Sequence, residues 1–326
     1  MGDNLPEHAG YVDQYAAWWR GALEGYTDKS SVKQGESIVF KVSVRSDLLL
    51  ATYSVQFFWV GATDVPMSAP ALNPPGPNYT GAFQPLHDAN GTAINLNDYS
   101  RYPMEYRNGC EWPTPWPIAF TLTIPTTWQS GFYYAKLTST PGSNVGLIPF
   151  VVKEDVPGST SKILCVIAWN TYQAYNYCGG ASLYWCTGQY ESPELDGQNR
   201  QVIRTVSFQR PFGLHYHWDD SNNPCGTSGR YQFVNQLGQF DHRERQFINW
   251  AESNGYNMEY SIDFDVHDQG PALLNNYKLV VFPGHSEYWS NNQRVSVKKL
   301  QERRWQSSFF CCKQLLLEGG FPSEQH

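Results

Sequence analysis

The chain has 326 residues, of which 23 are Lys or Arg and 30 are Asp or Glu, and its formal net charge is −7 at neutral pH. The basic side chains form no run, so the sequence offers no positively charged surface for a phosphate backbone. Nucleic acid is therefore excluded as an expected partner. The length is sufficient for two domains of ordinary size, each with its own core.

The N-terminus and the cysteines indicate the compartment. The first ten residues contain acidic side chains and a proline, whereas a secretory signal needs a basic start and an apolar run. No later stretch approaches the roughly 20 apolar residues of a membrane span. The seven cysteines include no CxxC pair, which argues against a disulfide framework and a zinc ribbon. We expect a soluble, cytoplasmic protein that does not bind membranes.

The first half of the chain has a β pattern. Residues 1–24 carry aromatic side chains at roughly helical spacing and are predicted to form a short helix or a docking arm. Residues 25–154 alternate β-branched and aromatic side chains between Pro, Gly and Asn clusters, which predicts an immunoglobulin-like β-sandwich ending near Lys153. Its clearest predicted strands are Ser37–Val44, Tyr53–Val60, Ile118–Ile124, Tyr134–Leu137 and Leu147–Val152.

The second half alternates predicted strands with helices. Residues 155–161 form a linker by composition, and residues 162–326 are predicted to be an α/β domain with a mainly parallel sheet, of the Rossmann or glutamine-amidotransferase-like class. The predicted strands are Lys162–Trp169, Gln201–Phe208, Tyr256–Asp263 and Tyr277–Pro283. Residues 240–253 place apolar side chains on one helical face, and Gly255 stands where the helix should stop.

Three segments that follow predicted strands carry the side chains suited to chemistry. They are residues 170–184, 207–218 and 284–290, and each offers a phenol, a carboxylate or an imidazole. The carboxyl ends of parallel strands meet at one edge of a sheet, so these segments are expected to converge on one crevice. The tyrosines could equally be packing at a domain interface, with His285 an ordinary polar loop residue. Read chemically, phenolate and carboxylate are hard donors that prefer trivalent iron to zinc.

Three motifs in these segments carry a family resemblance. Residues 172–184 read Tyr-Gln-Ala-Tyr-Asn-x-x-Gly-Gly-x-Ser-Leu-Tyr, residues 206–211 read Val-Ser-Phe-x-Arg-Pro, and residues 284–290 read Gly-His-x-Glu-Tyr-Trp-Ser. In this order they resemble the C-terminal module of N,N-dimethylformamidase large subunits. Weaker similarity, at Glu24–Lys29 and Trp128–Tyr133, extends into the β domain.

The resemblance implies a mononuclear, non-haem ferric ion, Fe(III), held by two tyrosines and a glutamate. The implied ligands are Tyr175, Tyr216 and Glu287, with Tyr172 and Tyr184 as alternatives to Tyr216. His285 would stand beside the metal as a catalytic residue together with Glu287, hydrogen-bonding a water or the substrate carbonyl. Arg210 is expected to position Glu or backbone groups.

The activity that the resemblance implies is hydrolysis of a small amide or formamide, such as N,N-dimethylformamide, to an acid and an amine. A ferric ion lowers the pKa of a water and polarises the amide carbonyl without redox change. The family also implies a small partner subunit and a homo-oligomer. One alternative is a non-catalytic, truncated relative that acts as a binding or structural protein. A glutamine-amidotransferase-like thiol hydrolase needs a cysteine at a strand-to-helix elbow and is the least favoured alternative, because Cys165 lies inside a predicted strand and Cys178 lacks an obvious elbow.

The sequence departs from the family after residue 302. Residues 303–320 fit neither the preceding helix nor a further strand, where the family has a Gly-Gly-Asn-rich strand. Synonymous codons for residues 304–319, read one nucleotide later, can encode such a strand, so we hypothesise a frameshift near Arg303. Codon degeneracy is the competing explanation. A frameshift would replace the family's catalytic Asn at about Lys313 or Gln314 and would lower turnover.

Overall fold

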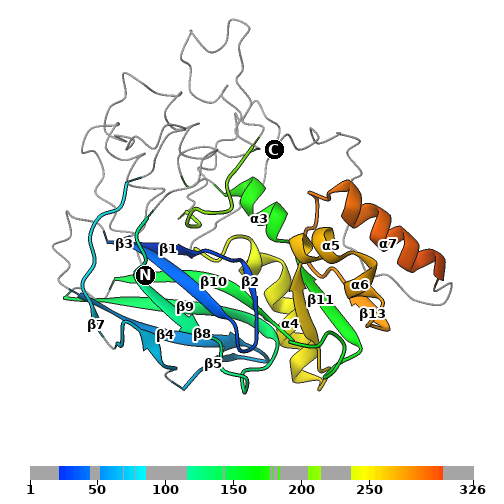
Figure 1. Cartoon of the computed structure of the whole chain (residues 1–326), viewed down its shortest axis with the longest axis horizontal. Coiled ribbons are helices and arrows are strands. Elements are labelled where there is room, and N and C mark those ends of the chain that lie inside the picture. Colours follow the sequence, from blue (N-terminus) through cyan, green and yellow to red (C-terminus); the bar gives the residue numbers. More distant parts are fainter. Residues whose placement is uncertain are drawn as a thin grey trace, which may run out of the picture.

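The computed structural model in Figure 1 describes residues 22–44, 52–68, 70–76, 78–85, 116–141, 144–176, 178, 183, 205–213 and 236–303. Several predictions lie outside these residues. They are the N-terminal arm up to residue 21, the ligand positions Tyr184 and Tyr216, and the altered segment 304–326.

Two facing β-sheets form the first part of the structure (Figure 1). The first sheet has the order β1-β3-β8-β6 and the second the order β2-β10-β9-β4-β5, with β7 paired to β4. Strands β2 and β10 run parallel, and the other described pairs of these two sheets are antiparallel. The strands are β1 Leu23–Thr27, β2 Ser31–Lys33, β3 Ser37–Val44, β4 Thr52–Val60, β5 Asp64–Pro66, β6 Leu72–Asn73, β7 Asn78–Tyr79, β8 Phe120–Thr123, β9 Gly131–Thr140 and β10 Val145–Lys153.

Alternation along the strands builds the core between these sheets. Ile38, Phe40 and Val42 point inward from β3 and are buried. Phe40 stacks on Phe120 of the same sheet at 4.7 Å and meets Phe150 of the facing sheet edge-on at 5.6 Å. The period-2 pattern that predicted these strands is therefore the pattern of their burial. The predicted boundaries of β3 are confirmed, and β1 begins at Leu23, inside the predicted arm.

A parallel three-stranded sheet with the order β12-β11-β13 forms the second part. The strands and helices of this second part are β11 Ile163–Ile167, α3 Trp169–Tyr175, the 3₁₀ helix η4 Phe240–His242, α4 Glu244–Ser253, β12 Glu259–Ile262, α5 Asp263–Gln269, α6 Pro271–Leu274, β13 Leu279–Val281 and α7 Asn291–Arg303. Gly255, with φ at 77°, follows α4 as predicted.

Both faces of this sheet are covered. Cys165 and Ile167 of β11 face a core that contains α4 and residues of the sandwich. Leu164 and Val166, which alternate with them, face α5, α6 and α7. A strand buried on both faces reads as a continuous apolar run, as Ile163–Ile167 does.

Two sequence predictions are corrected here. Residues 205–208, predicted as the end of a strand, have no regular secondary structure in the described chain. Phe208 instead contacts Phe264 at a ring separation of 5.7 Å. Its side chain is partly buried against the core cluster that contains α4, without belonging to a sheet. Residues 169–175, predicted as strand end and loop, form α3, since β11 ends at Ile167.

The predicted linker 155–161 is tied to the sheet. The Glu259 carboxylate accepts hydrogen bonds from the backbone N–H groups of Gly158, Thr160 and Ser161, at 2.7 to 2.9 Å, and from the Tyr277 hydroxyl at 2.6 Å. Burial alone would raise the pKa of Glu259, but these donors hold it below its ordinary value. The linker composition is thus compatible with a fixed conformation.

Asp265 joins the sandwich to the parallel sheet. Its carboxylate pairs with Lys153 of β10 and accepts hydrogen bonds from Ser31 of β2 at 3.0 Å and from Ser261 of β12 at 2.9 Å. It also accepts the Ile262 N–H at 3.1 Å, which caps α5.

Asp265→Ala is expected to lower the free energy of unfolding by about 3 kcal/mol, because it leaves the mostly buried Lys153 ammonium without its partner. Urea unfolding checks this. The control is Glu302→Ala, which breaks an exposed pair with Lys298 and should change the free energy by less than about 0.5 kcal/mol. Equal effects of the two variants would contradict the prediction.

Among the described residues, no helix is both long and apolar enough to cross a membrane.

Candidate functional site

Helix α3 begins at the carboxyl end of β11 and carries the first site residue. Both carboxylate oxygens of Asp263 accept the Asn170 N–H, at 2.9 and 3.1 Å, and so satisfy a free donor in the first turn of α3. Burial is the main cause that raises the pKa of Asp263 well above its ordinary value. Asp263 therefore serves as a helix cap for α3. Tyr175 ends the helix.

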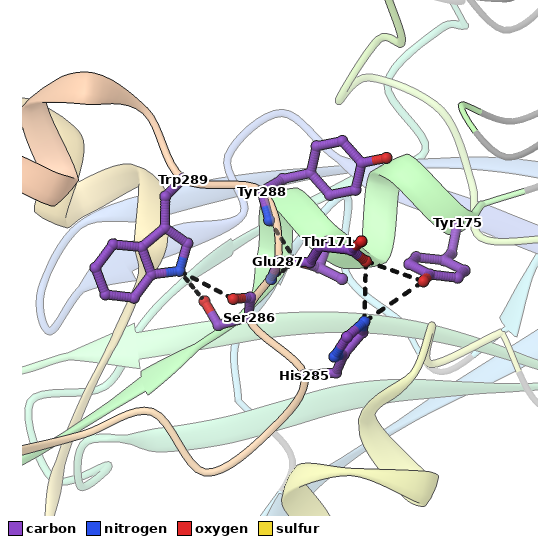
Figure 2. A network of polar contacts seen from close by, with 7 residues as sticks. All are labelled: Thr171, Tyr175, His285, Ser286, Glu287, Tyr288 and Trp289. Carbon is purple, nitrogen blue, oxygen red and sulfur yellow. Dashed lines mark hydrogen bonds and ion pairs between the residues drawn. The ribbon is translucent and has the colours of Figure 1, made fainter. Parts of the chain in front are cut away.

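The segment after β13 lies against α3 and is held there by one hydroxyl. Thr171 Oγ1 accepts the backbone N–H groups of Glu287 at 3.0 Å and Tyr288 at 3.3 Å. Figure 2 shows these bonds and, beside them, the Trp289 indole donating to Ser286. This segment has no regular secondary structure, so these contacts set its position relative to α3.

Tyr175, His285 and Glu287 converge on one point. In Figure 2 the phenol comes from α3 and the imidazole and carboxylate come from the segment after β13. The Tyr175 hydroxyl donates to Glu287 Oε2 at 3.0 Å, His285 Nε2 lies 2.9 Å from the same oxygen, and the phenol and imidazole are 3.4 Å apart. The His285 side chain is 25% exposed and that of Glu287 12%, so the cluster is reachable from solvent yet partly shielded.

The spacing of the Tyr175 hydroxyl and Glu287 Oε2 would fit two ligands of one metal ion. Two ligand atoms at right angles around an ion, each about 2.1 Å from it, are about 3.0 Å apart. The 3.0 Å between the Tyr175 hydroxyl and Glu287 Oε2 matches this value and is equally an ordinary hydrogen-bond distance. A phenol oxygen and a carboxylate oxygen are hard donors, which suit a trivalent cation. Among the described residues, no group of three or more His, Cys, Asp or Glu side chains is placed to hold a metal ion.

Arg210 and Asn176 fix the end of α3. The buried Arg210 guanidinium donates to the carbonyl oxygens of Gln173 at 2.7 Å and Cys178 at 2.8 Å. Asn176 donates to the Pro211 carbonyl oxygen at 2.9 Å and accepts the Gly213 N–H at 3.0 Å. The expectation that Arg210 positions backbone groups is confirmed. The segment 205–213 therefore holds the helix end that carries Tyr175.

Tyr172, an alternative ligand from the sequence, points elsewhere. It is 1% exposed, and its hydroxyl faces the Glu244 carboxyl. Burial and then Glu244 raise the pKa of Tyr172 well above its ordinary value, which disfavours the phenolate that a metal ligand needs. Its Oη atom has no hydrogen bond of ordinary geometry to the described residues. Tyr175 is thus the tyrosine that the helix presents to Glu287.

Cysteine chemistry has little support from the structure. Cys165 lies within β11, and burial, followed by Glu244 and Glu252, raises the pKa of its thiol well above the ordinary value. Cys178 is also buried. A nucleophilic cysteine requires a thiolate in an accessible, electropositive place, which Cys165 lacks.

Sequence reasoning missed Thr171 and Glu244. Thr171 gave no signal beyond its place one turn before Tyr175, where i and i+4 residues share a helix face. Glu244 is completely buried, and burial raises its pKa to about 8, although Tyr172 and the Ala168 N–H act in the opposite direction. From sequence alone it resembles an ordinary acidic residue in the first turn of α4.

Comparison with known proteins assigns the family. The sequence model described as "N,N-dimethylformamidase beta subunit-like, C-terminal" matches residues 79–314 of the 326-residue chain. The chain belongs to this family. The N,N-dimethylformamidase resemblance that the sequence motifs indicated is therefore confirmed.

Two curated relatives of this dimethylformamidase family match at similar strength. They are the N,N-dimethylformamidase beta subunits of Paracoccus aminophilus and of an Alcaligenes species. Each is 25% identical over 194 residues, which cover 54% of this chain and 24% of the relative. The match thus spans about a quarter of the relatives' length. A solved structure of the N-terminal four Ig domains of Dscam1 matches 44% of this chain and 30% of its own at 14% identity, with a TM-score of 0.16, which is too low to support an argument.

Proposed function

We propose that the chain hydrolyses a small amide or formamide, with N,N-dimethylformamide as the model substrate, at a mononuclear ferric site. The observation that supports this is the convergence of Tyr175, His285 and Glu287 within 3.4 Å of one another. The membership of the dimethylformamidase family supports the reaction class. Tyr175 and Glu287 are the proposed ligands, together with Tyr216, which lies outside the described residues.

The side chains have distinct roles in this proposal. Fe(III), when bound, would supply a Lewis acid that activates a water and polarises the amide carbonyl. Glu287, and Tyr175 once its phenol has released its proton to solvent, would hold the ion through two negative oxygens, and Thr171 holds Glu287 through its backbone N–H. His285 Nε2, adjacent to Glu287, can hydrogen-bond the attacking water or the carbonyl oxygen and can hold a proton during the reaction. Water adds to the carbonyl carbon, the C–N bond breaks, and an acid and an amine are released.

Metal content and turnover test the proposal on the same sample. The purified chain is reconstituted with ferric ion, and its iron content, visible spectrum and release of dimethylamine from N,N-dimethylformamide are measured. We expect about one iron per chain, a phenolate-to-iron absorption band and amine release above that of the metal-free chain. A chain that binds no iron would contradict the proposal and favour a non-catalytic relative. Iron binding without amine release from any of a series of formamides and acetamides would refute the hydrolase assignment.

The architecture and assembly are part of the same proposal. We propose an immunoglobulin-like class for the sandwich of residues 25–154 and a Rossmann or glutamine-amidotransferase-like class for the region from residue 162, supported by the paired sheets and by the parallel sheet with helices on both faces. Because the two relatives are named as beta subunits, we also propose that this chain assembles with a small partner subunit and with further copies of itself.

A further inference from the structure

A buried carboxyl group lies directly behind the segment that carries His285 and Glu287. Glu244, the first residue of α4, is completely buried. A Cβ atom added to Gly284 would lie 2.0 Å from Glu244 Oε1 and 2.7 Å from Oε2. The carboxyl group is therefore packed against the α-carbon of Gly284, and any side chain at that position would displace it. Gly284 immediately precedes His285.

The same carboxyl group reaches helix α3 from the other side. Tyr172, one turn before Tyr175, directs its hydroxyl toward Glu244, and the Ala168 N–H at the start of α3 lies nearby. The Tyr172 ring is itself fixed, because a Cβ on Gly238 would meet its ring atoms at 3.0 to 3.1 Å and Phe212 contacts it edge-on. Glu244 thus touches both elements that supply the candidate site.

The polar atoms of this contact are incompletely satisfied. Both Glu244 oxygens and the Tyr172 hydroxyl are buried, and none has a hydrogen bond of ordinary geometry to the described residues. A buried polar group without a partner destabilises the folded chain by roughly 1 to 3 kcal/mol, so an apolar side chain would be favoured here if packing were its only role.

We propose that Glu244 and Tyr172 form a positioning pair that sets the distance between α3 and the segment from Gly284 to Ser290, and thereby the approach of Tyr175 to Glu287. The pair touches neither substrate nor metal. It acts from behind the site, with Glu244 as a spacer against Gly284 and Tyr172 as its counterpart on α3. Its consequence for metal binding rests on the proposed function, whereas its effect on the segment's position does not.

The test measures how strongly the segment 284–290 is protected from hydrogen exchange. The bonds from the backbone N–H groups of Glu287 and Tyr288 to Thr171 Oγ1 should slow the exchange of these hydrogens with solvent. Hydrogen exchange of a peptide covering residues 284–290 is compared in the full chain and in Glu244→Gln and Glu244→Ala variants at pH 7. We expect Glu244→Ala to accelerate this exchange at least tenfold, and Glu244→Gln, which keeps the shape and polarity of the side chain, to stay within about threefold of the original chain.

Ile248→Ala is the matched control, because Ile248 is also completely buried and lies one turn later on α4. It should lower overall stability without a selective effect on residues 284–290. Gly284→Ala approaches the contact from the opposite side and should accelerate exchange as Glu244→Ala does, so the test stands even if Glu244→Ala fails to fold. Equal acceleration in Ile248→Ala, or a Glu244→Gln variant as fast as Glu244→Ala, would overturn the positioning role.

Iron affinity separates this inference from the proposed function. If both are correct, Glu244→Ala weakens ferric binding about 10- to 100-fold and Glu244→Gln restores it. If no variant binds iron while exchange follows the expected order, the metal site is refuted and the positioning pair stands. If iron binds equally in all variants and exchange is unchanged, the pair is refuted and the metal site stands.

Discussion

Glu287→Gln is expected to reduce ferric binding at least 100-fold and to reduce amide hydrolysis by about 100- to 1000-fold. The substitution keeps the size of the side chain but removes its negative charge, and Oε2 is the atom on which the Tyr175 and His285 contacts converge. Lewis-acid stabilisation of the transition state amounts to several kcal/mol, and each 1.36 kcal/mol corresponds to about tenfold in rate. Iron titration and single-substrate kinetics measure the two losses.

Tyr175→Phe tests whether the phenol oxygen of Tyr175 binds the ferric ion. It should weaken and shift the phenolate-to-iron band, to which Tyr216 would still contribute, while leaving the Glu287 N–H bonded to Thr171. Tyr256→Phe is the control, because Tyr256 is 49% exposed and stacks on Trp250, away from the cluster. A band that survives Tyr175→Phe unchanged, or that disappears in Tyr256→Phe, would contradict the assignment of Tyr175 as ligand.

The Glu244→Gln variant is expected to be more stable than the original chain, by a margin that grows as the pH rises, because the original chain loses stability. Burial raises the pKa of Glu244 to about 8 from its ordinary 4.5, so between these values the folded chain holds a proton that the unfolded chain has released. The original chain therefore loses stability as pH rises through this window, by roughly 1.4 kcal/mol per pH unit from this group, and the amide variant does not. The difference should be small near pH 4.5 and several kcal/mol above pH 8.

Other groups facing Glu244 titrate in both proteins and largely cancel in the difference. They are Cys165 on β11, Tyr172 on α3, Asp263 on α5 and the adjacent Arg243. The measurement is urea unfolding of both chains at intervals from pH 5 to pH 9. A stability difference that stays constant over this range would show that Glu244 is ionised in the folded chain, contrary to the prediction.

The sequence was most informative where local pattern and burial coincide. The bounds of β3 follow from its alternation, because one face of the strand lies in the core. Alternating apolar residues also suggested a strand at residues 201–208, but Phe208 packs on Phe264 outside the sheet. Local pattern does not distinguish these two forms of burial, since the difference depends on which distant element is nearby.

The candidate site was also only partly predictable from the sequence. Tyr175, His285 and Glu287 were selected from motifs, and the structure brings all three together. Tyr172 and Tyr175 could not be ranked by composition, because only the rotation of α3 decides which phenol faces Glu287. Glu244 was not predicted at all, since an acid in a first helical turn is normally solvated.

The shared core gives the sandwich a second role. Phe132 of β9 stacks on Phe240 of η4 at a ring separation of 3.6 Å, within the cluster that also holds β11 and β12 side chains. The face of β9 that points away from the sandwich core is therefore buried against the part of the chain that carries the candidate site. A substitution that changes side-chain volume on either side of this interface is therefore expected to disturb the packing of both the sandwich and the part of the chain that carries the candidate site.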